Sequence, residues 1–577
     1  LGQCLLYNTP EAVHERLPRW VPEARLAITA EARIDNRDEL CDHFAIPRAE
    51  RPTTPDSDLI LRAYLKWGEA SPEHLLGDWS FAIWHPDARK LFLARDHHGN
   101  TSLCYWRQGE RFAFASAPQA LHAIGAPRRL NELYLAQVLI SWPAYHGPQT
   151  IDLDIQRLPP AHAMTVTPQG MRTWRYWRLE DTPELRLPRR DDYVQGFLEV
   201  YAEAVRCRLR SYRPVGVTLS GGLDSGSVTA LAARELARQG RRLTAFTAVP
   251  LYDTTRTVGP KRFGDETEYA AATAAFCGNV DHILLDSAEV TPMAGIHRTL
   301  AIMPEPAHAA SNYFWITDLL EQARAAGLGT LLTGQGGNAT VSWTGAPELR
   351  SRLAAFRHGG WKAGIRHNLP LSLLRPLMRL RAPGQDWSGT AIHPDFARRM
   401  ALSARRLAAM GQDVTLQESW RGPRDLRYAI IQPGAGRVGD LWARQGAAAG
   451  LEVRDPTQDQ RVMAYTLAVP DAVFDAEDGM DRWLMRQAMA GWLPEAVRLN
   501  ARRGRQSADL AGRLLASAAE VEAALATVAS SPASDYLEVA KMRRAWADVQ
   551  RDVTALSTHR AGTILLRGLM AGLFLNL

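Results

Sequence analysis

From residue 215 onward, short apolar strands alternate with helices, and this alternation restricts the fold more than any other feature of the chain. The runs VGVTL, RLTAFTAV, HILLD and LGTLLTG have the length and composition of buried strands. Strands that alternate with helices form parallel sheets with helices on both faces. We therefore expect an α/β protein whose second half is a doubly wound parallel sheet, followed from about residue 388 by a mostly helical tail.

The first 180 residues follow a different pattern. Runs such as RLAITAEARI, WSFAIWH and KLFLARD combine β-branched and aromatic residues and have turn signals between them, which is typical of a β-rich domain. The polar stretch 180–192 contains two prolines and has the composition of a linker. These patterns predict two domains, residues 1–180 and 193–577.

Composition narrows the class of protein. Of the 577 residues, 23% are charged and 46% are hydrophobic, as in folded soluble proteins, and the net charge of +6 does not require a nucleic acid partner. The five cysteines form no C-x-x-C pair, which favours a reducing compartment over a disulfide or zinc framework. We see neither a signal peptide nor an apolar run long enough for an integral membrane segment, and expect a cytoplasmic protein.

The segment SGGLDS, residues 220–225, lies between the first of these strands and a helix. Its glycines let the backbone approach a ligand closely, and the N–H groups at the start of the helix favour an anion. Asp224 would be repelled by phosphate alone, so its presence indicates a bridging Mg²⁺. The alternative is a capped helix after a glycine turn, but the full strand–SGGLDS–helix arrangement favours a phosphate site. No GxxxxGK[ST] motif is present.

VGVTLSGGLDSGSV resembles the PP-loop of the asparagine synthetase class of ATP pyrophosphatases. DSDLILRAYLKWG and LLGDWSFAIWHPDARKLFLARDHHG look like the glutaminase-type N-terminal domain of that family, and LLTGQGGN and GLEVRDPTQD stand where it has two further conserved segments. The resemblance implies an N-terminal-nucleophile-like (Ntn-hydrolase-like) αββα sandwich packed on a PP-loop (HUP) domain. It also implies that ATP and Mg²⁺ activate a carboxylate as an acyl-adenylate.

The chain departs from the family in its glutaminase segments. Glutamine-hydrolysing members use a cysteine directly after the initiator methionine, whereas Cys4 here follows Leu1-Gly2-Gln3. The glutamine-binding N-G-E stretch of the family reads Glu31-Ala32-Arg33 here, so it has lost its amide and gained a cation. The resemblance therefore implies a degenerate, catalytically inactive amidotransferase-like domain, and an attacking amine that comes from the substrate itself.

Two departures concern the adenylation site. The family loop G-E-G-x-D-E reads Gly334-Gln335-Gly336-Gly337-Asn338, so Asn338 replaces an acid that helps hold Mg²⁺, and the tyrosine of the β-lactam synthetase branch is absent. Arg502 replaces the lysine of a late R-x-K-x-G motif and would balance phosphate charge. We predict Asp224 and Asn338 as metal ligands, and an ATP site formed by Leu219, Ser220, Gly221, Gly222, Asp224, Ser225, Gly334, Gln335 and Gly336.

Catalytic roles are predicted for Asp224, Arg502, Glu305 and His308. Glu305 and His308 precede the helix that leads into the GQGGN strand, and one of them could accept a proton from the attacking amine; a structural histidine is the alternative. Residues 349–385 contain eight Lys or Arg and no acid, which indicates either a solvated helical face or a surface for a peptide, an acidic partner or a membrane.

The absent glutaminase motif, GQGGN and RRGRQ together look like the lasso peptide cyclase branch of this family. That resemblance implies a ligase of ribosomal peptide (RiPP) biosynthesis that forms an isopeptide, or macrolactam, bond between an Asp or Glu side chain and the N-terminal amine of a precursor core peptide. A leader peptidase and a leader-binding protein would be its partners. The alternatives are a small-molecule amide or β-lactam synthetase, an asparagine synthetase that uses free ammonia, and a non-catalytic scaffold.

Overall fold

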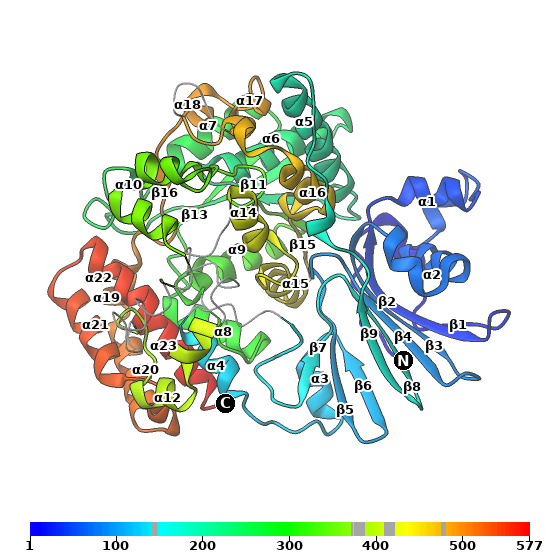
Figure 1. Ribbon diagram of the computed structural model, residues 1–577, viewed down its shortest axis with the longest axis horizontal. Helices are drawn as coiled ribbons and strands as arrows, with labels where there is room; N and C mark the ends of the chain where they lie inside the picture. Colours follow the sequence, from blue (N-terminus) through cyan, green and yellow to red (C-terminus); the bar gives the residue numbers. More distant parts are fainter. Residues whose placement is uncertain (141–146, 308, 371–372, 374–386, 409–421, 475–479) are drawn as a thin grey trace.

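The computed structural model describes residues 1–140, 147–307, 309–370, 373, 387–408, 422–474 and 480–577. The N-terminal part contains two antiparallel sheets, with strand orders β1-β2-β3-β4-β8-β9 and β6-β5-β7 (Figure 1). The strands are β1 (Arg19–Val21), β2 (Leu26–Ile34), β3 (Gly77–His85), β4 (Lys90–Arg95), β5 (Cys104–Gln108), β6 (Arg111–Ala115), β7 (Ile155–Arg157), β8 (His162–Thr167) and β9 (Gly170–Arg175).

Apolar contacts order these two sheets into layers. Helices α1 (Arg37–His43) and α2 (Asp56–Trp67) share a core with one face of the larger sheet, because alternate residues of β2 and β3 point toward them. The other face shares a core with β5 of the smaller sheet. Helix α3 (Pro118–Ala123) packs through Leu121 against the far side of β5. The layers therefore run helix, sheet, sheet, helix.

A parallel five-stranded sheet forms the centre of the second half. Its order is β13-β11-β10-β14-β15, and each neighbouring pair is parallel. The strands are β10 (Val215–Thr218), β11 (Leu243–Ala248), β13 (Val280–Leu285), β14 (Thr330–Leu332) and β15 (Glu452–Arg454). The mixed α/β class expected from the alternating pattern is confirmed. Because the strand order reverses direction at β10, its carboxyl end is a position where ligands bind in open α/β sheets.

Helices cover both faces of this sheet. Helices α5 (Arg190–Arg208), α6 (Leu223–Arg238) and α7 (Thr267–Cys277) share a core with Val217 and Ala245. Helices α8 (Pro292–Ile302) and α9 (Tyr313–Ala325) share another core with Phe246 and Leu331, together with α4 (Glu132–Leu139) of the N-terminal part. Successive side chains of a strand point to opposite faces of the sheet, so the neighbouring residues Ala245 and Phe246 of β11 enter different cores.

The tail is mostly helical, and its last helices join the core of α8 and α9. It includes one π-helix, η11 (Ala561–Leu566). The remaining α-helices in the described part of the chain are α10 (Arg352–Asn368), α12 (Pro394–Arg399), α13 (Leu402–Ala408), α14 (Pro423–Ile431), α15 (Val438–Ala448), α16 (Gln460–Ala468), α17 (Trp483–Ala488), α18 (Glu495–Arg498), α19 (Leu510–Ala516), α20 (Ala518–Ala529), α21 (Val539–Arg551), α22 (Ala555–Arg560) and α23 (Arg567–Phe574). Among the described residues, no helix combines the length and apolarity needed to cross a bilayer.

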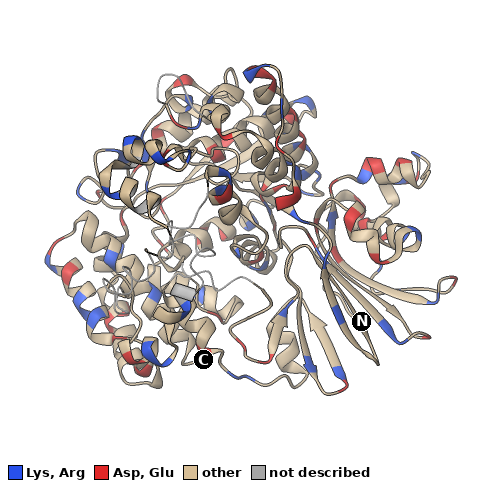
Figure 2. Cartoon of the chain, in the orientation of Figure 1, with Lys and Arg blue, Asp and Glu red and all other residues tan. Residues whose placement is uncertain are grey.

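The basic stretch 349–385 is described only at residues 349–370 and 373. Helix α10 carries Lys and Arg and no acidic residue (Figure 2). It is kinked at Gly360 (φ 74°), and it leaves the side chains of Leu353 and Trp361 82% and 66% exposed. Its apolar side chains therefore do not all pack against the domain below, while binding of a peptide, partner or membrane by this stretch stays a prediction.

Buried arginines join the two halves of the molecule. Arg33, at the end of β2, lies within 2.9 Å of Asp35, 2.6 Å of Asp78 and 2.8 Å of Glu452. Arg208, at the end of α5, lies 2.5 Å from Asp459 and 3.4 Å from Asp35. Both arginine side chains are only 2% exposed. Asp35 and Asp78 belong to the N-terminal part and Glu452 and Asp459 to the second half, so these ion pairs bridge the two.

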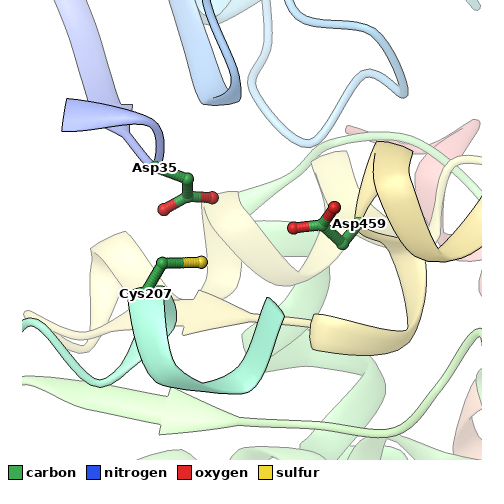
Figure 3. Close-up of side chains that lie close together, drawn as sticks. All are labelled: Asp35, Cys207 and Asp459. Carbon is green, nitrogen blue, oxygen red and sulfur yellow. The ribbon is translucent and has the colours of Figure 1, made fainter. Parts of the chain in front are cut away.

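Asp35, Cys207 and Asp459 lie close enough together to suggest a metal site (Figure 3). Their chemistry argues against one. Arginines lower the pKa of both carboxyls, that of Asp459 to about 2, so each negative charge already has a fixed positive partner. Burial raises the pKa of the Cys207 thiol to about 12, which keeps it from forming the thiolate that binds metals. We interpret the group as part of the interdomain ion-pair cluster.

We expect Arg208→Met to destabilise the protein by about 3–5 kcal/mol, because Asp35 and Asp459 would lose a buried cation. The matched control is Arg206→Met, which removes an exposed i,i+3 pair with Glu203 and should cost less than about 1 kcal/mol. Urea denaturation followed by tryptophan fluorescence measures both. Equal midpoints for the two variants would contradict a stabilising role of the cluster.

Candidate functional site

A cavity of about 820 Å³ lies at the carboxyl end of the parallel sheet. It is bordered by the ends of β10 and β11, by the start of α6, by α9 and by the segment that contains β16 (Arg503–Gly504). Of the residues that the sequence predicts for the site, the lining includes Leu219, Ser220, Gly221, Gly222, Asp224, Ser225, Gly334, Gln335, Asn338 and Arg502. Gly336 is not among these lining residues.

The SGGLDS loop is held by hydrogen bonds among its own residues. The Ser220 backbone N–H donates to Ser225 Oγ at 2.9 Å, and the two serine hydroxyls lie 2.8 Å apart. The Gly222 N–H donates to Ser220 Oγ at 3.3 Å. Helix α6 then begins at Leu223, so its N-terminus and the loop face the cavity together. Free N–H groups and hydroxyls at a helix N-terminus are suited to bind phosphate.

Gly221 is needed because other residues crowd it. A Cβ atom at this position would lie 3.0 Å from Tyr269 Cβ and 3.3 Å from the Phe263 ring. The Gly221 N–H donates to Glu266 Oε2 at 3.2 Å, and burial raises the pKa of Glu266. Glu266 therefore fixes the loop from the start of α7. The acidic segment Asp265–Glu266 in the sequence could have indicated this contact.

Asp224 carries the clearest ligand signal in the cavity. Its Oδ1 atom is buried and has no hydrogen-bond partner. Burial raises the pKa of Asp224, while Ser342 and the nearby cations Arg482 and Arg503 oppose that rise. A buried carboxylate oxygen without a partner is costly unless a cation binds it. This carboxylate therefore fits a divalent cation, which Asp224 would hold and which would neutralise phosphate charge.

The GQGGN loop packs directly on Asp224. A Cβ at Gly337 would lie 2.4 Å from Asp224 Cγ, and one at Gly334 would lie 2.9 Å from the Asp224 carbonyl carbon. The Gly336 N–H donates to Asp455 Oδ2 at 2.8 Å, and burial raises the pKa of Asp455 to about 6. Sequence reasoning missed Asp455, although it follows β15 within the segment GLEVRDPTQD.

Arg482 is a second residue that sequence reasoning missed. It is 9% exposed, has left-handed backbone geometry (φ 62°) and immediately precedes α17. Its Nη2 donates to Asn338 Oδ1 at 2.9 Å, and its charge acts on Asp224. A non-glycine residue with this strained geometry is often found at a functional site. The contact also occupies the oxygen with which Asn338 was predicted to bind metal, so that role stays a prediction.

The RRGRQ segment forms another part of the cavity wall. Strand β16 pairs in parallel with β12 (Arg262–Phe263), which places Gly504 beside Glu266. Arg502 Nη2 donates to the Arg262 carbonyl at 2.8 Å, and the exposed Arg502 guanidinium lies 5.7 Å from the centre of the Phe263 ring. Arg502 thus lines the cavity. Among the described residues, no carboxylate lies within ion-pair distance of its guanidinium.

Glu305, one of the two predicted catalytic bases, is not among the described residues that line this cavity. Glu305 is 6% exposed and forms ion pairs with Arg437 at 2.5 Å and Arg444 at 2.8 Å, which lower its pKa. It is not among the lining residues, and its contacts are those of a structural ion pair; a catalytic role for it stays a prediction without geometric support. His308 lies outside the described residues.

We expect Gly337→Ala to weaken ATP binding roughly tenfold or more, because overpacking against Asp224 costs about 1–3 kcal/mol and would displace that carboxylate. The control is Gly259→Ala, where an added Cβ has no atom within 4 Å. Isothermal titration with Mg²⁺ and ATP measures both affinities. An unchanged dissociation constant for the Gly337 variant would separate the GQGGN loop from nucleotide binding.

Comparisons with known proteins place the chain in a family. Residues 16–177 match a glutamine amidotransferase domain, and residues 196–571 match asparagine synthase. Asparagine synthetase [glutamine-hydrolyzing] 3 of Bacillus subtilis is 33% identical over 33% of this chain and 30% of its own length. Amidase chyE of Penicillium rubens is 26% identical over 57% of this chain and 48% of its own length. The matches thus span less than half of each of these relatives. Because one family model covers well over half of it, the chain belongs to the asparagine synthase family.

Proposed function

We propose that this chain is an ATP-dependent carbon–nitrogen ligase that activates a carboxylate and converts it to an amide. The observation that carries the proposal is the unpartnered, buried Asp224 Oδ1 in a cavity between a glycine-rich helix N-terminus and the cation of Arg502. Membership of the asparagine synthase family supports the same chemistry, as does the similarity to an asparagine synthetase of Bacillus subtilis.

The chain's own residues fit ATP and Mg²⁺. Asp224 would hold the metal, which neutralises phosphate charge when it is bound. Ser220 and Ser225 would bind the phosphates through their hydroxyl groups, and Gly221 and Gly222 would let the phosphates approach the N-terminus of α6 closely. Arg502 would balance the charge of the departing pyrophosphate. Arginine keeps its charge at all relevant pH values, so Arg502 acts as an electrostatic partner and not as an acid or base.

The reaction proceeds in two steps. A carboxylate oxygen of the substrate attacks the α-phosphorus of ATP, and the bond to pyrophosphate breaks. An amine nitrogen then attacks the carbonyl carbon of the acyl-adenylate, the bond to AMP breaks, and the amine gives up a proton to a base or to water. Adenylation thereby replaces a poor leaving group with a good one.

The N-terminal part supports a substrate amine over ammonia made from glutamine. Arg33, which stands where the family has the acid of its N-G-E stretch, is 2% exposed and is held by Asp35, Asp78 and Glu452. Its guanidinium is therefore committed to interdomain ion pairs. We infer that this amidotransferase-like domain, an Ntn-type αββα sandwich in our interpretation, has lost glutamine binding and serves as a scaffold for the adenylating domain.

A single substrate that carries both the carboxylate and the attacking amine would need no ammonia from glutamine. We therefore propose a lasso peptide cyclase that adenylates an Asp or Glu side chain of a core peptide and closes a macrolactam with the peptide's N-terminal amine. A leader peptidase and a leader-binding protein in the cytoplasm would supply that peptide. A small-molecule amide synthetase, or an asparagine synthetase that uses free ammonia, would have the same adenylation site and differ in the amine.

The test is mass spectrometry after incubation of the protein with ATP, Mg²⁺ and leader-free candidate core peptides. We expect loss of one water from the cognate peptide, with one AMP formed for each ring. Asp224→Ala should abolish both products, because the metal loses its carboxylate. Asp253→Ala is the matched control: its carboxylate is exposed, bonds to Thr255 and does not line the cavity.

Three other outcomes of this experiment would contradict parts of the proposal. Asparagine formed from aspartate, ammonium and ATP, without peptide dehydration, would contradict the cyclase and support a small-molecule ligase. AMP formed equally by the Asp224 and Asp253 variants would remove Asp224 from the site. Absence of nucleotide binding in the wild-type protein would contradict any ligase activity and leave a scaffold.

A further inference from the structure

Two smaller cavities adjoin the main cavity beneath the tail helices. The inner one, of about 120 Å³, shares Ser311, Arg505 and Ser507 with the main cavity and is closed by residues of α22 and η11. The outer one, of about 330 Å³, is lined by Arg262, Arg505, Ala555 and His559. Because Arg505 lines all three cavities, we treat the two smaller ones as one side compartment that opens from the main cavity.

The side compartment has a one-sided charge. Among the described residues, its lining contains Arg262, Arg505, Arg567 and His559 and no carboxylate. Within the described part of the chain, no Asp or Glu forms an ion pair with Arg262 or Arg505. Arg505 donates to the Thr257 carbonyl, and burial beside Arg262 lowers its pKa. Two neighbouring cations that no acid neutralises favour an anionic ligand.

Local backbone geometry shapes this compartment. The π-helix η11 contributes Gly562 and Thr563 to its wall, and π-helical turns are rare and occur frequently at functional sites. On the opposite side, Ser507 has left-handed geometry (φ 49°), and its hydroxyl donates to Asn312 Oδ1 at 2.8 Å. The strained residue and the widened helix thus border the same space from two distant parts of the chain.

We propose that the side compartment binds a carboxylate-bearing segment of the acyl substrate and guides it to the main cavity. The proposal rests on the proposed function, because it names the substrate class of that same site as acidic. Arginine binds carboxylates through paired N–H donors, which suits Arg262 and Arg505. Phosphate has the same hydrogen-bonding chemistry, but the SGGLDS loop already provides a site for it together with Asp224, whereas no carboxylate that could hold a metal lines the side compartment.

The experiment measures binding to the full chain by isothermal titration, with hexa-L-glutamate and hexa-L-glutamine as probes. We expect hexaglutamate to bind at least about tenfold more tightly than hexaglutamine, since the two probes are nearly equal in size and only the first has negatively charged side chains. Ala555→Glu places a negative charge in the outer cavity and should weaken hexaglutamate binding about tenfold. The matched control is Leu556→Glu, the next residue of α22, which is 57% exposed and lines neither cavity. Both variants should bind Mg²⁺ and α,β-methylene-ATP as the wild-type protein does.

Two results would overturn the proposal. One is equal hexaglutamate affinity for the Ala555 and Leu556 variants, which would place the acidic probe elsewhere. The other is full displacement of hexaglutamate by pyrophosphate or by α,β-methylene-ATP, which would show that the carboxylates occupy the phosphate site. Nucleotide binding is titrated separately, so its failure would contradict the proposed ligase function and leave the result on the acidic probe independent.

Discussion

The site depends on close approach between chain segments that only glycine permits. Gly221 packs on Tyr269, Gly337 packs on the Asp224 side chain, and a Cβ at Gly504 would lie 1.5 Å from Glu266 Oε1. Each glycine belongs to a different segment of the second half, and each contact brings one segment against the next. Without side chains at these three positions, the loops that border the cavity can converge on one point. Any larger residue would push them apart, because a packed interior has little space to absorb an added methyl group.

Three buried carboxyl groups lie at or next to the cavity, and they differ in what surrounds them. Asp224 lies among fixed cations, while Glu266 and Asp455 are engaged by the backbone N–H groups of the two glycine-rich loops. Burial raises the pKa of all three carboxyls. The two carboxyls that hold loops have hydrogen-bond donors, and Asp224 Oδ1 alone among the three is a buried oxygen without one. Glu266 and Asp455 therefore hold loops in place, whereas Asp224 keeps one carboxylate oxygen without a hydrogen bond from the protein.

Local pattern predicted much of this architecture, since short apolar strands and the SGGLDS turn are defined by neighbouring residues. The mixed α/β class and the family followed from them. Arg482 and Asp455 could not be found in that way, because their roles depend on contacts with loops more than 100 positions away in the chain. Glu305 shows another limit of local pattern: its place before a site helix suggested catalysis, its ion pairs with Arg437 and Arg444 could not be read from the neighbouring residues, and its catalytic role stays a prediction.

The arginine that interrupts the glutamine-binding stretch has a consequence for the integrity of the molecule. Glu452 begins β15, an edge strand of the parallel sheet, and its carboxylate is shared between Arg33 and Arg454. Asp459 likewise faces Asp35 across Arg208. Removing the N-terminal part would therefore expose the charged groups of Glu452, Arg208 and Asp459 close to β15, the edge strand that Asp455 follows. The second half depends on the N-terminal part in this way, because each half supplies an arginine that neutralises a carboxylate of the other.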